Sequence, residues 1–208
     1  MYRNGIKRLL AVVLSLCGML CLSWLFLILA IAIKLDSPGP VFFKQKRVGR
    51  GKRHFYILKF RTMRIDTPHD MPTHLLHDPD QYITRMGHFL RKTSLDELPQ
   101  LLNILKGDLS IVGPRPERPE IAAQYCEEMP EFALRLQAKA GLTGYAQVYG
   151  KYNTTPYDKL QMDLMYIAHP SLIEDLKIML ATVKILFMPE STEGISEGQT
   201  TAMSGENN

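Results

Sequence analysis

A long uncharged segment near the start of the chain dominates the hydrophobicity pattern. Residues 9–33 contain no charged side chain. At about 1.5 Å per helical residue, the segment is long enough for the roughly 30 Å hydrocarbon core of a bilayer. A cleaved signal peptide is the alternative, since basic residues precede the segment and Ala30-Ile31-Ala32 ends it, but the apolar region of a signal peptide is shorter. The pattern predicts a membrane helix, with residues 1–35 as an anchor.

Basic residues lie on both sides of this segment. They are Arg3, Lys7 and Arg8 before it and Lys34, Lys44, Lys46, Arg47 and Arg50 after it. The positive-inside rule places basic flanks in the cytoplasm, and a straight span cannot place both there. A helix that breaks and returns to its own side can do so, and Gly18 and Ser23 favour such a break. We therefore expect a re-entrant membrane helix.

Two segments after the anchor have the composition of β-strands. Residues 40–48 and 54–63 are separated by Gly49-Arg50-Gly51-Lys52, which predicts a β-hairpin. Alternation along the second strand places Lys59 and Arg61 on one side and Phe60 on the other.

The region of the hairpin is strongly basic. Residues 44–64 contain nine Lys or Arg residues and no acidic residue. A solvated surface would account for this, and so would nucleic-acid binding. Directly after an apolar anchor, however, the basic region is better explained by anionic headgroups and a lipid phosphate.

The rest of the chain has mainly helical periodicity. Leu98, Leu101, Leu102 and Leu105 recur at helical spacing, after a Ser94-x-x-Glu97 pattern that predicts a capping box. Further helices are expected at 83–92, on either side of Pro130, at 156–168 and at 171–187. The last has an apolar face, which either contacts the bilayer or packs in the core. The predicted fold class is therefore α+β: a membrane helix, a small and mainly helical domain over 36–189 with a short hairpin, and a polar tail over 190–208.

Charged groups are concentrated in residues 91–120. Asp96 and Glu97 fall in a predicted first helical turn, where acidic side chains commonly complement the helix dipole. A helix N-terminus also binds anions, and Arg91, Lys92 and Arg115 could bind a phosphate. Carboxylates beside phosphate-binding groups suggest a divalent cation such as Mg²⁺, with Asp96 as a ligand.

Composition excludes several other classes of site. The net charge of +4 is mild, and the 208 residues suffice for one domain with an anchor. Cys17, Cys21 and Cys126 form no CxxC pair, so a disulfide framework or zinc site is not expected. His69, His74 and His77 lie in a Pro-containing segment that predicts a solvated loop rather than a zinc site.

Three segments resemble the bacterial sugar transferases, the monotopic polyprenyl-phosphate phosphoglycosyl transferases. They are SPGPVFFKQKRVGRGKRHFYILKFRTM, LRKTSLDELPQLLNILKGDLSIVGPRPE and GLTGYAQVYG, in the family's order. The chain departs from the family pattern at Ala11, Trp24, Ala140 and Tyr145, where the family usually has Asp, Pro, Pro and Trp. Trp24 removes the Pro that breaks the family's membrane helix.

The resemblance implies an activity and a set of site residues. Such enzymes move a sugar-1-phosphate from a UDP-sugar to undecaprenyl phosphate and release UMP, with Mg²⁺ as cofactor. Asp96 would be the nucleophile that forms a phosphoryl-aspartate, with Glu97 beside it. Phosphate contacts would come from Lys59, Arg61, Arg91 and Arg115, with Arg115 fixed near the nucleotide by Pro114 and Pro116. The enzyme would act at the cytoplasmic face of the bacterial inner membrane, and downstream glycosyltransferases would be further partners.

The sugar and the class of function leave alternatives open. The tail EGISEGQTTAM resembles small members that use UDP-N,N′-diacetylbacillosamine or a related acetamido sugar. The competing interpretation is a non-enzymatic, membrane-tethered basic module that binds anionic lipid or nucleic acid through residues 44–64. That interpretation does not account for two carboxylates, two arginines and a Pro-Arg-Pro in one short segment.

Overall fold

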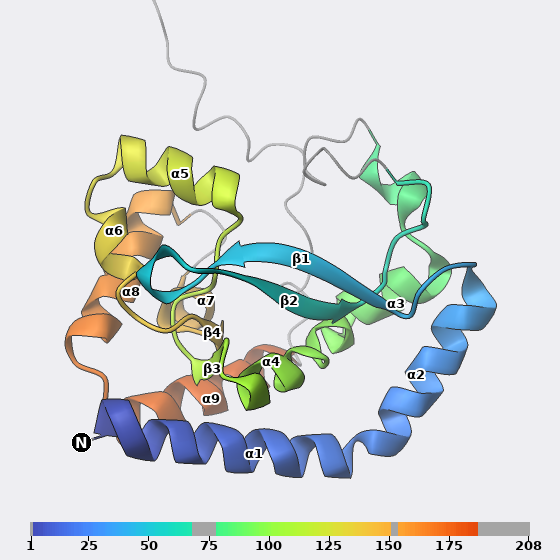
Figure 1. Cartoon of the computed structure of the whole chain (residues 1–208), viewed down its shortest axis with the longest axis horizontal. Coiled ribbons are helices and arrows are strands. Elements are labelled where there is room, and N and C mark those ends of the chain that lie inside the picture. Colours follow the sequence, from blue (N-terminus) through green and yellow to red (C-terminus); the bar gives the residue numbers. More distant parts are fainter. Residues whose placement is uncertain (1, 68–77, 151–153, 187–208) are drawn as a thin grey trace, which may run out of the picture.

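The computed structural model describes residues 2–67, 78–150 and 154–186, and it shows helices arranged around a long two-stranded hairpin (Figure 1). The α-helices are α1 Lys7–Cys21, α2 Ser23–Asp36, α3 Arg85–Lys92, α4 Gln100–Lys106, α5 Pro119–Glu128, α6 Phe132–Arg135, α7 Tyr145–Tyr149, α8 Pro156–Ala168 and α9 Leu172–Leu186. The strands are β1 Phe42–Val48, β2 His54–Phe60, β3 Ser110–Val112 and β4 Gly141–Thr143. The predicted mixture of helices and a small sheet is confirmed. The predicted tail and His69, His74 and His77 lie outside the described residues.

The uncharged segment forms two helices rather than one. α1 and α2 meet at Leu22 and are bent by 62° from each other, and Ser23 Oγ donates to the Leu20 carbonyl at 2.9 Å. In the described part of the chain, no single helix is long and apolar enough to cross a membrane, whereas the bent pair passes this test by length and composition. The predicted break is therefore present, and entry into a membrane stays a prediction.

The predicted hairpin is confirmed, and it packs on α4. β1 and β2 are antiparallel, with Phe43 opposite Lys59, and Arg47 opposite Phe55. Asn103 of α4 joins the two elements, because its Oδ1 accepts from the Leu58 N–H at 2.9 Å and its Nδ2 donates to the Tyr56 carbonyl at 2.7 Å. Ile57 and Ile104 are buried in the same core. The hairpin is thereby fixed over the helix that follows Asp96 and Glu97.

A second, parallel strand pair, β3 with β4, was not predicted from the sequence. Ser110 pairs with Gly141, and Val112 with Thr143. A Cβ added to Gly141 would lie 2.2 Å from the Gly113 nitrogen, so only a glycine allows the two backbones to approach this closely. This contact determines where the chain leaves β3 and enters Pro114-Arg115-Pro116.

The predicted C-terminal helices are confirmed and pack around buried charge. α6 and α8 are joined by an ion pair in which Arg135 Nε lies 2.6 Å from Asp163 Oδ2. The Asp163 side chain is 1% exposed and that of Arg135 8%. α9 buries Ile178 but exposes Leu172, Ile173, Leu176, Leu180 and Val183. It therefore contributes to the core and also exposes an apolar face, and contact of that face with a bilayer stays a prediction.

Candidate active site

The two carboxylates of the central segment lie at the start of a helical turn. Leu95–Glu97 is a 3₁₀-helix that leads through Leu98 and Pro99 into α4. The predicted capping box is wrong: Ser94 adopts a left-handed conformation with φ of 55°, and its side chain makes no cap hydrogen bond. The carboxylate of Glu97 binds cationic side chains instead of the backbone of Ser94. The segment therefore presents both carboxylates toward groups from other elements.

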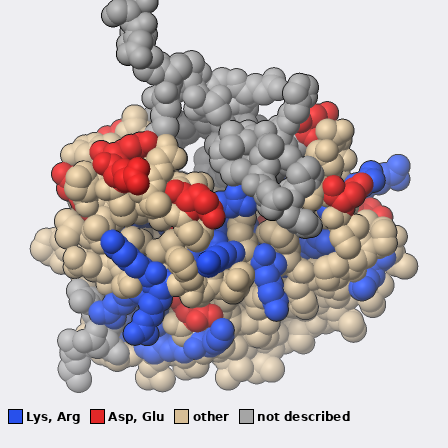
Figure 2. All heavy atoms as spheres, turned by 45° about the horizontal axis from the view of Figure 1, so that its top comes forward, with Lys and Arg blue, Asp and Glu red and all other residues tan. Residues whose placement is uncertain are grey.

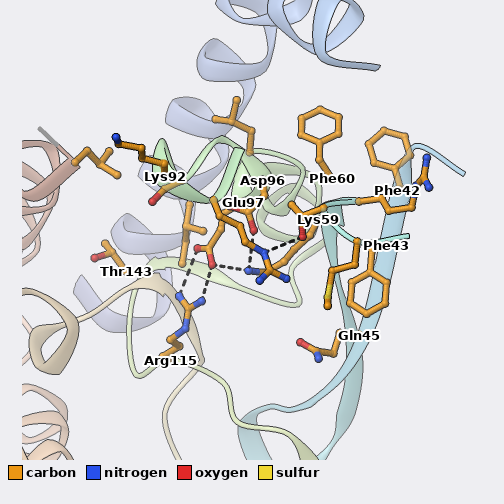
Figure 3. A pocket seen from close by; sticks show the side chains of 18 of the residues that line it. Phe42, Phe43, Gln45, Lys59, Phe60, Lys92, Asp96, Glu97, Arg115 and Thr143 are labelled. Carbon is orange, nitrogen blue, oxygen red and sulfur yellow. Dashed lines mark hydrogen bonds and ion pairs between the residues drawn. The ribbon is translucent and has the colours of Figure 1, made fainter. Parts of the chain in front are cut away.

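Lys59 and Arg115 contact the pair from two different sides (Figure 3). Lys59 Nζ lies 2.7 Å from Glu97 Oε1 and 3.2 Å from Asp96 Oδ2. Arg115 binds Glu97 through both carboxylate oxygens, with Nη2 at 2.5 Å from Oε1 and Nη1 at 3.4 Å from Oε2. Glu97 is thus held at both oxygens. Asp96 Oδ1 accepts no hydrogen bond from the described residues, so one oxygen of Asp96 is left for other chemistry.

The two carboxylates have opposite pKa shifts. Burial raises the pKa of Asp96 above its usual value, although the charges of Lys59 and Arg91 act in the other direction. Burial would raise the pKa of Glu97 as well, but the charges of Arg115 and Lys59 outweigh it and hold that pKa well below the usual range. Glu97 is therefore ionised beside the two cations down to lower pH than Asp96, and Asp96 is the more basic of the two carboxylates.

Arg91 reaches the site from α3. Its Nε donates to Thr62 Oγ1 at 3.0 Å, and its charge favours the ionised form of Asp96. α3 lies close to the chain at Thr62, since a Cβ on Gly87 would be 2.0 Å from the Thr62 carbonyl oxygen. The structure therefore brings Arg91 to the predicted site. Thr62, which orients it, was not predicted.

Arg61 has a different environment from the one expected. Its Nε, Nη1 and Nη2 donate to the carbonyls of Pro40, Pro38 and Ser37 at 2.7, 2.7 and 2.8 Å, and the residue is only 7% exposed. β2 ends at Phe60, so strand alternation does not extend to Arg61. Arg61 fixes the loop after α2 and also lines the cavity that contains Asp96, so its phosphate contact stays a prediction.

The Pro-Arg-Pro turn is held on both sides. The Pro114 carbonyl accepts from the Gly141 N–H at 2.9 Å, and the Pro116 carbonyl accepts from Arg47 Nη1 at 3.0 Å. The two prolines are buried, and Arg115 between them is partly exposed. The turn therefore presents Arg115 to Glu97. Arg47 and Gly141 are contributors that the sequence reading missed, because they are distant from the turn along the chain.

Asp96, Glu97, Lys59, Arg91 and Arg115 line one large cavity. Its volume is about 1590 Å³, and Arg47 and Arg118 line it as well. The cavity also has an apolar lining, to which Leu98, Leu101, Ile111, Leu142, Met179 and Val183 contribute. A ligand with both anionic and apolar parts matches this lining.

The carboxylates of the site could hold a divalent cation only together with substrate oxygens or water. No group of three or more His, Cys, Asp or Glu side chains that could hold a metal occurs among the described residues. Mg²⁺ is commonly held by one or two carboxylates together with substrate phosphates and water. Asp96 Oδ1, which has no partner in the described part of the chain, fits such a shared site. Glu97, bound to two cations at its oxygens, fits it poorly.

Comparison with known proteins places the chain in a family. The model of the family described as "Bacterial sugar transferase" matches residues 2–189. A UDP-glucose:undecaprenyl-phosphate glucose-1-phosphate transferase of Caulobacter vibrioides is 44% identical over 192 residues, which cover 89% of this chain and 71% of the relative.

Two longer relatives differ in the sugar that they are named for. A UDP-glucose:undecaprenyl-phosphate glucose-1-phosphate transferase of Xanthomonas campestris pv. campestris is 41% identical over 86% of this chain. A UDP-N-acetylgalactosamine-undecaprenyl-phosphate N-acetylgalactosaminephosphotransferase of Aeromonas hydrophila is 39% identical over 87% of it. The matches span only 38% and 43% of these two relatives. Because the family model covers nearly the whole chain, the protein belongs to the bacterial sugar transferase family.

Proposed function

We propose that this protein transfers a sugar-1-phosphate from a UDP-sugar to undecaprenyl phosphate and releases UMP. The observation that carries the proposal is the asymmetry of the carboxylate pair. Glu97 is bound by Arg115 and Lys59, whereas Asp96 keeps an oxygen without a partner among the described residues. Relatives named as UDP-sugar:undecaprenyl-phosphate transferases support the substrate classes. The tail supports an acetamido sugar such as N,N′-diacetylbacillosamine.

The proposed reaction has two steps at one phosphorus. Asp96 attacks the β-phosphorus of the UDP-sugar, the bond from that phosphorus to the bridging oxygen breaks, and UMP leaves with the electron pair. The sugar then remains on the protein as a phosphoryl-aspartate. An oxygen of undecaprenyl phosphate attacks the same phosphorus, forms a diphosphate-linked lipid and restores the Asp96 carboxylate.

The basic side chains have separate roles in this scheme. Lys59 and Arg91, whose charges both act on Asp96, bind oxygens of the β-phosphate, and Arg115 exchanges part of its contact with Glu97 for the diphosphate. Glu97 keeps Lys59 and Arg115 in place when no substrate is bound. Mg²⁺, held by Asp96 and the diphosphate, would offset phosphate charge when bound.

The proposed location is the cytoplasmic face of the bacterial inner membrane. α1 and α2 enter the bilayer as a re-entrant pair, supported by the bend of 62° and by basic residues on both flanks. Downstream glycosyltransferases that extend the lipid-linked product are proposed partners.

A basic binding module accounts less well for the structure. Figure 2 shows Lys and Arg side chains spread across one face, around the hairpin. Within the basic region, however, Arg47, Lys59, Arg61 and Arg64 line the cavity, and Arg61 is buried. The exposed members are Lys44, Lys46, Arg50, Lys52, Arg53 and Arg64. The side chains nearest the carboxylates are thus arranged around a cavity rather than on an open surface.

UMP release tests the proposal. The purified protein is incubated with polyprenyl phosphate, Mg²⁺ and a panel of UDP-sugars that includes UDP-glucose, UDP-N-acetylgalactosamine and UDP-N,N′-diacetylbacillosamine. We expect UMP release with at least one donor, lost in excess EDTA; release beyond one UMP per protein should depend on the lipid acceptor. Activity that persists in EDTA would contradict the role of the cation. Lipid binding without UMP release from any donor would favour the basic module.

A further inference from the structure

Arg47 faces the cavity from the same side of the hairpin as Lys59. Strand register places Phe43 opposite Lys59 and Arg47 opposite Phe55, so Phe43, Gln45, Arg47 and Lys59 share one face. Gln45, labelled in Figure 3, lies along this face beyond Phe43. Its Oε1 accepts from Arg47 Nη2 at 2.5 Å, while Arg47 Nη1 donates to the Pro116 carbonyl at 3.0 Å. The Arg47 guanidinium is therefore oriented by two neutral acceptors.

The charge of Arg47 has no carboxylate partner within the described part of the chain. The Arg47 Nε is buried and makes no hydrogen bond there. Glu97 is bound to Arg115, and Glu117 lies 3.6 Å from Arg135. Burial, followed by the like charge of Arg115, lowers the pKa of Arg47 to about 10, although Glu117 and Glu97 act in the opposite direction.

Retaining such a charge is unfavourable unless an anion compensates it. A partly buried cation without a counter-ion costs desolvation energy that two neutral acceptors only partly restore. Arg47, Arg115 and Arg118 line the same cavity, and Glu97 offsets the charge of Arg115 among them. This excess of positive charge beside the Pro114–Pro116 turn requires an anionic ligand.

We propose that Arg47 binds the α-phosphate of the UDP-sugar, the phosphate that departs with UMP; this inference rests on the proposed function. When the bond from the β-phosphorus to the bridging oxygen breaks, its electron pair stays on that oxygen. The oxygen becomes a terminal oxygen of UMP. A cation fixed beside the α-phosphate therefore stabilises charge that increases during the step. Arg47 acts on the leaving group, whereas Lys59 and Arg91 act beside the nucleophile.

The position of Arg47 favours the nucleotide over the lipid phosphate. β1 begins beside the loop that leaves α2, and Arg47 lies near the other end of the strand, toward α5 and α6 (Figure 1). That end is joined to the region after α6 by the Gly51 N–H, which donates to the Leu136 carbonyl at 2.8 Å. A lipid that enters beside α2 would meet Lys59 before Arg47. The phosphate at Arg47 is therefore assigned to the donor.

The comparison of UMP with uridine tests this assignment without requiring turnover. Dissociation constants of both ligands are measured for the parent protein, for Arg47→Gln and for Lys46→Gln. Lys46→Gln is the matched control, since it removes the same charge from the exposed face of the same strand. Loss of a charge-assisted contact should weaken UMP binding by about tenfold or more. Uridine binding should stay within about twofold, and Lys46→Gln should change neither.

The other possible results show whether the Arg47 inference or the proposed function is wrong. If Arg47→Gln binds UMP as the parent does, or weakens UMP and uridine equally, Arg47 is not a phosphate ligand. If it weakens a short-chain polyprenyl phosphate but not UMP, the site belongs to the lipid and the inference is overturned. A parent protein that binds no UMP would refute the proposed function itself. If Arg47→Gln does not fold, Arg47→Lys is measured in its place. A ratio of the dissociation constants for UMP and uridine equal to that of the parent protein would again contradict the inference.

Discussion

Lys59 and Asp96 are 37 positions apart in the chain, and the Nζ of Lys59 lies 3.2 Å from Oδ2 of Asp96. The contact joins the end of β2 to the turn before α4. Because Lys59 also binds Glu97 at 2.7 Å, one ammonium group links both carboxylates. Asp96 is therefore held in place through one oxygen while the other has no partner among the described residues.

Removing Lys59 should change the pH dependence of the first step. Burial raises the pKa of Asp96, and Lys59 partly offsets this increase. Lys59→Gln should therefore raise the pKa further, so that Asp96 becomes protonated, and inactive as a nucleophile, at a higher pH than in the parent. The rate of UMP release from UDP-sugar without lipid acceptor, measured as a function of pH, should show its acid limb displaced upward. Lys44→Gln, on the exposed side of β1, serves as the control. An acid limb that is unchanged or moves to lower pH would contradict the proposed influence of Lys59.

Gly141→Ala should displace the Pro-Arg-Pro turn. The new Cβ would lie 2.2 Å from the Gly113 nitrogen, and β3 and β4 would have to separate. Overpacking of this kind costs about 1–3 kcal/mol in the free energy of unfolding. A shift of Arg115 by about 1 Å should lower UMP release on the order of 100-fold. Gly5→Ala is the control, since its Cβ would meet nothing within 4 Å. Full activity of Gly141→Ala would show that the strand pair does not position Arg115.

Breaking the buried ion pair between α6 and α8 should destabilise the fold. Asp163→Ala removes the carboxylate at 2.6 Å and leaves buried Arg135 with Glu117 at 3.6 Å, which should lower the free energy of unfolding by about 3 kcal/mol. The exposed pair between Lys177 and Glu174 provides a comparison, and Lys177→Ala should cost less than about 1 kcal/mol. Denaturant unfolding in detergent measures both variants. Equal effects would mean that the buried pair contributes no more than a surface pair.

The re-entrant arrangement of α1 and α2 predicts that both flanks lie in the cytoplasm. Single cysteines replace Gly5 and Arg50 in a chain whose three native cysteines have been removed. A membrane-impermeant thiol reagent should label neither variant in intact cells and both after permeabilisation. Labelling at position 5 but not at position 50 in intact cells would show that the pair crosses the membrane.

Local sequence patterns predicted the elements whose conformation depends on residues adjacent in the chain. The turn Gly49–Lys52 and the composition of its flanks predicted the hairpin, and Pro130 marked the boundary between α5 and α6. The same reasoning failed at Ser94. The Ser94-x-x-Glu97 pattern predicts a cap only if Ser94 is extended, but it is left-handed.

Contacts between distant segments carry no such local signal. Gly113 and Gly141 approach each other through backbone packing, which neither sequence segment reveals by itself. The pairing of Arg47 with the Pro116 carbonyl similarly requires the hairpin to be placed beside the turn. The family resemblance identified Asp96, Glu97, Lys59, Arg91 and Arg115 as candidates because it reflects these tertiary constraints. It did not reveal that Arg61 is engaged with the loop after α2.

The intact mass of the protein after incubation with a UDP-sugar and Mg²⁺, without a lipid acceptor, tests the central claim most directly. The parent protein should gain the mass of one sugar-phosphate as UMP is released. Asp96→Asn should show no adduct, since an amide is a poor nucleophile, and unchanged thermal unfolding should show that this variant is folded. Glu97→Gln should keep a detectable adduct with slower turnover. An adduct that survives Asp96→Asn, or UMP release that requires both substrates bound together, would contradict Asp96 as the covalent nucleophile.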